Sequence, residues 1–176
     1  MARDVTLTGV ERTFDDDQII VSKTDPSGRL TYANEIFLQL AGMTEAETIG
    51  QPHSVIRHPE MPRAVFKLLW DTVSAGNELF AYVVNRSKNG DHYWVLAHVT
   101  PSFDSSGKIV GYHSNRRTAD RKVLETVIQP LYKKLLNIEE SHANRKDGMN
   151  EAYNTLMKIL EDKGVGYDEF IFSLQH

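Results

Sequence analysis

Residues 79–101, LFAYVVNRSKNGDHYWVLAHVTP, carry the strongest structural signal in this chain. It contains two runs rich in β-branched and aromatic residues, 79–86 and 92–101, joined by Lys88-Asn89-Gly90-Asp91. An Asn-Gly pair between two such runs is a strong signal for a β-hairpin, because both residues tolerate the positive φ angles of a tight turn. The sequence therefore predicts two antiparallel strands here.

Further strand signals lie on both sides of this hairpin. Residues 17–24 and 29–33 flank the turn Asp25-Pro26-Ser27-Gly28, which places proline and glycine where a tight reversal favours them. The turn 104–107 precedes a last run, 108–116. Together with the hairpin, these runs predict a five-stranded antiparallel sheet.

Short helices are expected between the second and third strands. Asn34 can cap a helix over residues 35–40, a second helix begins at Thr44 and closes at Gly50, and 63–74 carries apolar residues at helical spacing. Strands and helices in this order indicate an α+β domain of about 100 residues, with the helices covering one face of the sheet.

Residues 121–176 predict a helical C-terminal extension. The run 121–140 has apolar residues at helical spacing interrupted at Pro130, 144–148 reads as a loop, 149–163 is a second amphipathic helix, and 167–174 is a short third. The extension could dimerise, or it could fold as a cap on its own sheet, because exposed apolar stripes rarely stay unpaired.

Composition excludes several classes of function. Twenty basic against 24 acidic residues give a formal charge of −4, so we expect neither a nucleic-acid nor a membrane partner. No apolar run approaches the roughly 18 to 20 residues of a membrane span, and the first residues show no secretory leader, so we expect a cytoplasmic protein. Because there is no cysteine, a disulfide, a thiolate-bound metal and a cysteinyl cofactor adduct are excluded.

The segment QPHSVIRHPEMP, residues 51–62, is the main candidate for a binding loop. Its three prolines remove backbone donors, so we expect irregular structure with polar side chains directed at a ligand. His53, Arg57, His58 and Glu60 supply those side chains. A solvated surface loop of the same composition is the alternative.

Several motifs resemble those of PAS sensor domains. Residues 25–37, followed by 42–43 and 49–52, resemble the front half of such a domain, and 88–95 with 107–112 resemble its back half. The resemblance implies a PAS fold over residues 15–120, preceded by an N-terminal cap, 1–14, and followed by the helical extension, 121–176.

More specifically, residues 52–62 and 85–94 resemble the PAS domain of aerotaxis receptors, a subgroup that holds FAD non-covalently and reports redox state. The resemblance implies that cofactor-binding residues stand at eight positions of this chain. These are Asn34, His53, Arg57, His58, Glu60, Trp70, Phe80 and Asn85. Two depart from the usual pattern, since Glu60 replaces an aspartate and Phe80 replaces a tryptophan.

The chemistry of these residues suits a flavin independently of the resemblance. Asn85 presents both a donor and an acceptor, as the imide edge of an isoalloxazine requires. Arg57 can make a fork-like contact to phosphate or ribose oxygens, with His58 as a second donor. Structural roles are open for others: Asn34 can simply cap its helix, and Trp70 can belong to the core while also touching the ligand.

The expected function is that of a signal-transduction sensor, which binds FAD and reports redox or oxygen state to a chemoreceptor, kinase or cyclase in trans. We also expect that a homodimer can form through the PAS domain or the C-terminal helices. An enzyme is not expected, because no nucleophile-base arrangement, phosphate loop or metal-ligand spacing is present. The alternatives are a haem gas sensor, with His53, His58, His92 or His113 as axial ligand, and a cofactor-free interaction module.

Overall fold

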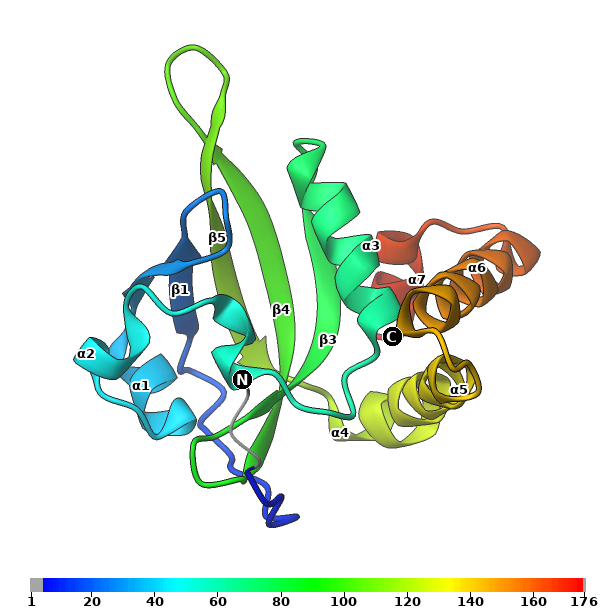
Figure 1. The fold of residues 1–176 in the computed structure, drawn as a ribbon, viewed down its shortest axis with the longest axis horizontal. Helices are drawn as coiled ribbons and strands as arrows, with labels where there is room; N and C mark the ends of the chain where they lie inside the picture. Colours follow the sequence, from blue (N-terminus) through cyan, green and yellow to red (C-terminus); the bar gives the residue numbers. More distant parts are fainter. Residues whose placement is uncertain (1–4, 176) are drawn as a thin grey trace.

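The computed structural model describes residues 5–175 and contains one five-stranded antiparallel sheet in the order β2-β1-β5-β4-β3 (Figure 1). The predicted hairpin is confirmed, with Leu79 of β3 opposite Val99 of β4, and Arg86 opposite His92. The strands are β1 Ile20–Thr24, β2 Leu30–Ala33, β3 Leu79–Arg86, β4 His92–Phe103 and β5 Ile109–Thr118.

The first and last strands meet in the middle of the sheet. β1 pairs with β5, which sets Ser22 opposite Ser114, and β4 pairs with the other side of β5. This order leaves β2 and β3 as the two edges. Residues of β1, β4 and β5, which lie far apart in the chain, are therefore neighbours at the centre of the sheet. The face of the sheet that the helices between β2 and β3 cover is called the inner face.

The predicted helices cover that inner face. They are α1 Glu35–Ala41, α2 Glu45–Thr48 and α3 Arg63–Ser74. The segment expected to be irregular, 51–62, contains one 3₁₀ turn, η1 His53–Ile56. Asn34 caps α1 through its side chain, and Thr44 with Glu47 forms a capping box on α2. Between these helices and the sheet lies the core, in which Phe37, Ile56 and Tyr93 are fully buried. The fold class predicted from the sequence is confirmed.

The C-terminal extension is helical, as predicted, and it lies beside β3 and α3 (Figure 1). Its elements are α4 Arg121–Val123, the π-helical turn η2 Leu124–Ile128, α5 Gln129–Glu140, α6 Arg145–Lys163 and α7 Tyr167–Ser173. The π turn directly precedes Pro130, whose ring would clash with a carbonyl of a regular preceding turn. The chain thus continues through the proline in one wider turn.

The predicted loop at 144–148 is wrong, because Asn144 caps α6 and the helix begins at Arg145. Gly148 lies inside the helix, where α6 crosses α5. A Cβ atom at this position would stand 2.4 Å from the carbonyl oxygen of Glu139. Glycine is therefore required by the close approach of two helices and not by a turn.

The extension folds onto its own sheet, which is the second of the two alternatives. The Tyr132 hydroxyl of α5 donates a hydrogen bond to the Tyr82 carbonyl, and Asp168 of α7 accepts one from the Phe80 amide at 3.0 Å. Phe172 also contacts the Phe80 ring. These contacts cover the exposed edge of β3 and the outer face beside it.

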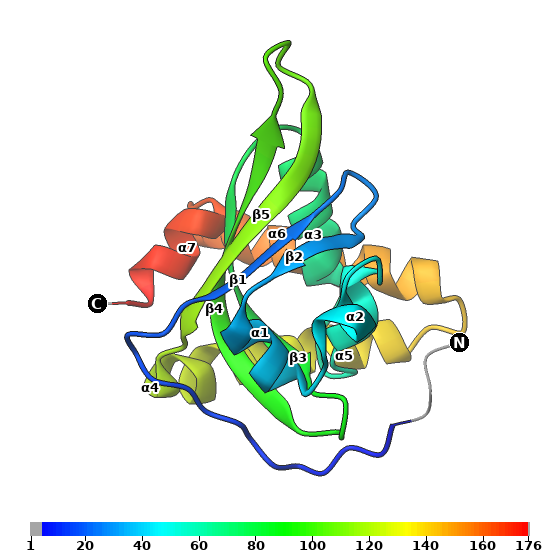
Figure 2. The same ribbon diagram turned by 90° about the vertical axis from the view of Figure 1, so that its left-hand side faces the viewer.

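The N-terminal segment crosses the β3–β4 turn (Figure 2). Asp91 fastens it, accepting hydrogen bonds from Thr8 Oγ1 at 2.6 Å and Arg12 Nε at 2.9 Å. Hydrogen bonds from Thr8, Asn89 and Arg12 lower the pKa of Asp91 to about 2. Residues 1–4 of the predicted cap lie outside the described residues. Within 5–175, no helix has the length and apolar character needed to cross a membrane.

Candidate functional site

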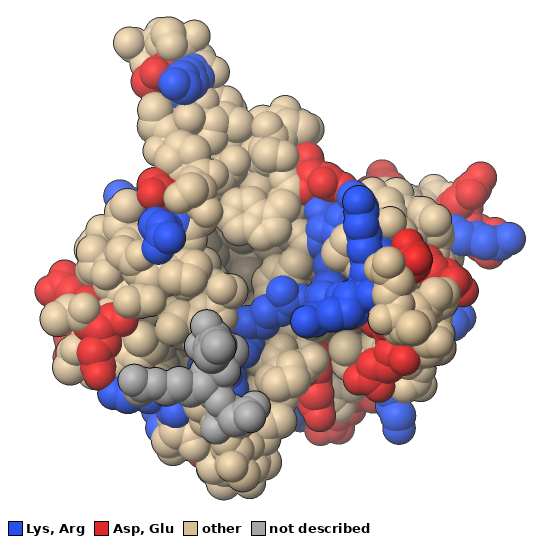
Figure 3. Space-filling view, in the orientation of Figure 1, with Lys and Arg blue, Asp and Glu red and all other residues tan. Residues whose placement is uncertain are grey.

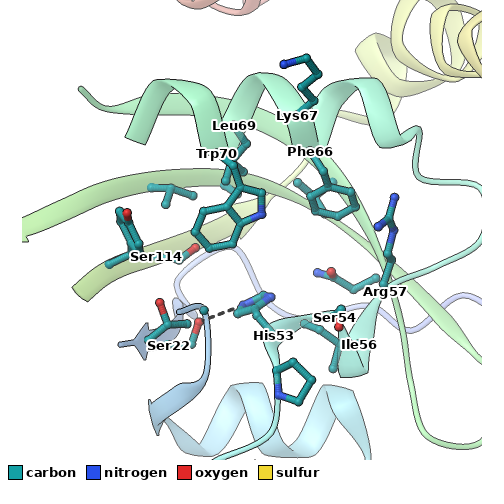
Figure 4. A pocket seen from close by; sticks show the side chains of 18 of the residues that line it. Ser22, His53, Ser54, Ile56, Arg57, Phe66, Lys67, Leu69, Trp70 and Ser114 are labelled. Atoms are coloured by element: carbon teal, nitrogen blue, oxygen red, sulfur yellow. Dashed lines mark hydrogen bonds between the residues drawn. The ribbon is translucent and has the colours of Figure 1, made fainter. Parts of the chain in front are cut away.

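A cavity of about 600 Å³ lies between the inner face of the sheet and α3, with η1 forming a third wall (Figure 4). Alternate residues of each strand face it, since successive side chains point to opposite sides of a sheet. The strand residues on its wall are Ser22, Thr24, Val83, Asn85, Ala97, Val99, Tyr112, Ser114 and Arg116. Such a volume is typical of a site for a small molecule or a cofactor.

The cavity offers flat apolar surface. Phe66, Leu69 and Trp70 of α3 line one side. The Trp70 ring meets Tyr112 of β5 edge to face, with 5.3 Å between the ring centroids. Gly28 lies beneath this pair, and a Cβ atom there would stand 3.3 Å from the indole. A planar aromatic ligand fits a slot of this kind.

Arg116 places an unneutralised positive charge on the cavity wall. It is 3% exposed, and within residues 5–175 no ion pair joins it to a carboxylate. Its Nη2 atom donates to Ser22 Oγ at 2.8 Å and to His53 Nε2 at 2.6 Å, and its guanidinium lies over the Phe37 ring. Burial lowers the pKa of Arg116 to about 10, so the group is still charged at neutral pH. Because burying an unpaired charge is costly, a ligand atom that accepts a hydrogen bond would stabilise this cation.

His53 lies beside this cation and is neutral at physiological pH. Burial, and then the charge of Arg116, lower the pKa of His53 to about 3. Because Nε2 accepts the Arg116 hydrogen bond, the proton of the neutral ring belongs on Nδ1. His53 can therefore act as a hydrogen-bond donor through Nδ1.

Four buried polar atoms on the cavity wall have no hydrogen-bond partner within the described residues. They are Thr24 Oγ1, Asn85 Nδ2, Ser114 Oγ and Arg116 Nη1. Native proteins leave few buried polar groups unsatisfied, and each such group costs about 1–3 kcal/mol. This concentration indicates a ligand that completes their hydrogen bonds.

The mouth of the cavity is basic. Arg57, Arg63 and Lys67 line it, and Figure 3 shows blue side chains along one side of the hollow. The Arg57 guanidinium lies 4.4 Å from the centroid of the Phe66 ring, and burial lowers its pKa. Three basic side chains thus gather at the entrance of a chain whose overall charge is −4, and two of them are in ion pairs, Arg63 with Glu139 and Lys67 with Asp71.

Four of the eight predicted residues lie on the cavity wall: His53, Arg57, Trp70 and Asn85. Asn34 does not line it. Its Oδ1 accepts from the Val21 and Phe37 amides, and its Nδ2 donates to the Ile19 carbonyl. These bonds tie α1 to β1, so the capping alternative describes what Asn34 does here.

His58 and Glu60 also lie off the cavity wall. His58 is buried against His92, with 5.8 Å between the ring centroids, and its Nδ1 accepts from the Glu60 amide. Burial lowers the pKa of His58. Glu60 is exposed. Both residues shape the loop that carries Arg57 to the cavity.

Phe80 lies on the opposite face of the sheet. Asn85 faces the cavity, and Phe80, five positions earlier on the same strand, points the other way because strand side chains alternate. Its ring stacks on His98 with 4.0 Å between centroids and contacts Phe172 of α7. The expected place beside a cofactor is corrected: Phe80 instead anchors the C-terminal extension.

The sequence reading missed Arg116, Ser22, Thr24 and Ser114. The strands that carry them were predicted, and alternation would have placed Ser114 and Arg116 on one face of β5. An arginine on the face of a strand that also carries Tyr112 is an unusual core residue, and that signal was available.

Comparison with known proteins identifies the class of protein. Residues 30–116 match the family model for the PAS fold. Residues 30–116 are therefore a PAS domain, which confirms the resemblance stated above.

Among curated proteins, the aerotaxis receptor of Escherichia coli (strain K12) is 45% identical over 121 residues. The match covers 68% of this chain but only 23% of that receptor, so the chain spans about a quarter of its relative's length. The other curated relatives include a nitrogen fixation regulatory protein of Klebsiella pneumoniae, 25% identical over 99 residues, or 56% of this chain and 20% of that protein.

Solved structures of light-oxygen-voltage domains are similar to this chain in fold. The dark structure of the blue-light photoreceptor Aureochrome1 LOV is 27% identical, with a TM-score of 0.54, covering 68% of this chain and 86% of that one. A light-oxygen-voltage domain studied with a flavin analogue has a TM-score of 0.56 at 18% identity, over 66% of this chain and 87% of that one. The latter likeness shows a shared fold.

Proposed function

We propose that this PAS domain binds FAD non-covalently and reports redox or oxygen state, in the cytoplasm, to a chemoreceptor, kinase or cyclase in trans. One observation carries the proposal. A largely apolar cavity of about 600 Å³ holds a buried arginine that has no ion pair and whose Nη1 is unsatisfied, together with three further unsatisfied polar side chains. A flavin ring is flat and apolar on its faces and has carbonyl and imide groups on one edge, which is the pattern that this cavity complements.

The residues fit each part of the cofactor. Trp70 and Tyr112 supply aromatic surface for the ring, and Asn85 offers an amide donor and acceptor for its imide edge. Arg116 offers a charged donor for a ring carbonyl. Arg57, Arg63 and Lys67 at the basic mouth would hold the phosphates of the dinucleotide. Since the chain lacks cysteine, no thiol adduct can form.

The relatives support the same choice. One receptor is named for aerotaxis, and the structural neighbours include a light-oxygen-voltage domain studied with a flavin analogue. Haem is less well supported by the geometry. Of the four histidines considered as axial ligands, the structure places only His53 on the cavity wall, and its Nε2 already accepts a hydrogen bond from Arg116.

A bound flavin supplies reversible electron uptake with a change of protonation on its ring. Asn85 can answer such a change, because rotation of its amide exchanges a donor for an acceptor. An isolated bridge joins Asn85 to Arg57, and backbone groups of the same strand form hydrogen bonds with α5 and α7. A rearrangement at Asn85 thus has a short path through β3 to the extension.

The test is to purify the full chain from flavin-replete cells, record its absorption spectrum and identify the released cofactor by mass spectrometry. We expect flavin absorption bands in the blue and near ultraviolet, and FAD as the cofactor released from the protein. Asn85→Leu should reduce flavin retention, whereas the matched change Asn154→Leu on the exposed side of α6 should not. A colourless protein that cannot be reconstituted with FAD or FMN contradicts the proposal and leaves a docking module. A Soret band contradicts it in favour of haem.

A further inference from the structure

The C-terminal extension contributes directly to the ligand cavity. Met149 of α6 lies on the cavity wall, beside the basic mouth formed by Arg57, Arg63 and Lys67. Met149 lies in the first two turns of α6, which begins at Arg145. The 28 residues 117–144 separate this helix from the end of the PAS match at residue 116. The ligand site is therefore built from two parts of the chain.

Two of the three cations at the mouth are also held by the extension. Arg63 pairs through Nε with Glu139 of α5 at 3.2 Å, and its Nη1 donates to the Arg145 carbonyl of α6 at 2.9 Å. Lys67 lies 4.8 Å from the centroid of the Tyr153 ring of α6. Arg63 and Lys67 thus belong to the cavity mouth and to the interface of α3 with the extension.

Glu139 links α5 to the first turn of α3. It is 4% exposed, and its second oxygen accepts a hydrogen bond from the Ala64 amide at 2.8 Å. Gly148 allows α6 to pass directly over the Glu139 backbone. The carboxylate therefore fixes α5 against the start of α3 and holds the Arg63 side chain at the cavity mouth.

The guanidinium of Arg63 keeps N–H groups that these contacts do not use. The contacts to Glu139 and Arg145 use Nε and Nη1, which leaves Nη2 for an anionic ligand. A guanidinium can contact a carboxylate and a phosphate at once, because its five N–H groups point outward in one plane. Ligand phosphate and docked extension therefore do not compete for this residue.

We propose that the C-terminal extension forms the outer wall of the ligand site and selects for a ligand that carries a diphosphate, so that binding of such a ligand tightens the docking of α6. The inference rests on the proposed function and names the part of the cofactor that the extension recognises. By thermodynamic linkage, the coupling runs both ways: the docked extension raises the affinity for the phosphorylated ligand by the same factor.

The experiment compares riboflavin, FMN and FAD as ligands of the ligand-free full chain. Wild-type protein should bind FAD more tightly than riboflavin. Met149→Glu, which sets a carboxylate at the mouth, should weaken FAD binding by about tenfold or more and leave riboflavin binding unchanged. Met157→Glu, the same change at an exposed position of α6, should alter neither. Arg63→Gln should likewise reduce the preference for FAD over riboflavin.

Hydrogen exchange provides a second readout. FAD should slow exchange of the α6 amides, residues 145–163, and riboflavin should not. The inference is overturned if Met149→Glu weakens riboflavin and FAD equally, or if it weakens neither, or if FAD leaves α6 exchange unchanged. If no flavin binds the wild-type chain at all, the proposed function fails instead. The two failures are thus distinguishable.

Discussion

Replacing Arg116 with methionine should separate binding from stability. Arg116 is buried with its Nη1 atom unpartnered, and burial lowers its pKa from the usual 12.5 to about 10. At 1.36 kcal/mol per pKa unit, this corresponds to roughly 3 kcal/mol of free energy that the charged form costs the ligand-free fold. Methionine has similar length, no charge and no donor.

The substitution also removes favourable contacts. Arg116 gives up hydrogen bonds to Ser22 and His53, each contributing about 1 kcal/mol, and its contact with the Phe37 ring, about 0.5–1 kcal/mol. The gain and the losses nearly cancel. We therefore expect the free energy of unfolding of ligand-free Arg116→Met to lie within about 1 kcal/mol of wild type, whereas breaking a structural buried ion pair typically costs 3–5 kcal/mol.

Flavin affinity should respond differently. Because one charge-assisted hydrogen bond to the ligand is lost, the dissociation constant for FAD should rise about ten- to hundredfold. Urea unfolding of the ligand-free protein and fluorescence titration with FAD measure the two quantities. The reasoning is refuted if Arg116→Met destabilises the fold by 3 kcal/mol or more while flavin affinity is unchanged, since Arg116 would then be a structural residue.

Three further predictions follow from the geometry. The pKa of His53 is near 6.5 in the unfolded chain and about 3 in the folded chain, so the unfolded state binds more protons between these two values. The free energy of unfolding should therefore fall as the pH drops through this window. The substitution His53→Gln should flatten that slope, as measured by urea titrations at several pH values. Gly148→Ala forces a Cβ atom against the Glu139 carbonyl and should lower the free energy of unfolding by about 1–3 kcal/mol; an unchanged melting curve would disprove the close approach. Phe80→Ala should destabilise the fold by about 2 kcal/mol through lost contact with α7 while leaving flavin affinity intact, and a weaker FAD titration would contradict its position on the outer face.

Local signals in the sequence predicted most of the architecture. The Asn-Gly turn predicted the β3–β4 hairpin, and Asn34 predicted the start of α1, because each depends on backbone conformations set within a few residues. The loop predicted at 144–148 failed for a non-local reason. Gly148 usually indicates a turn, and only the crossing with Glu139 explains a glycine inside α6.

The candidate site was predicted in part. The proline-broken segment supplied His53 and Arg57, and their place on the cavity wall agrees with the sequence reading. Arg116 was missed because its partners lie on β1 and η1, and pairing of β1 with β5 cannot be read from either strand alone. Phe80 was misplaced because the resemblance gave its position in the chain but not the face of the strand.

NMR can observe directly the side chains that the flavin ring is proposed to contact. In nitrogen-15 NMR spectra of the ligand-free full chain, addition of one equivalent of FAD should shift the side-chain amide of Asn85 and the guanidinium of Arg116. The side-chain amide of Asn34 should stay in place, because its hydrogen bonds are all made within the fold. If FAD binds but Asn85 and Arg116 do not shift, the cofactor does not occupy this cavity and the account is wrong.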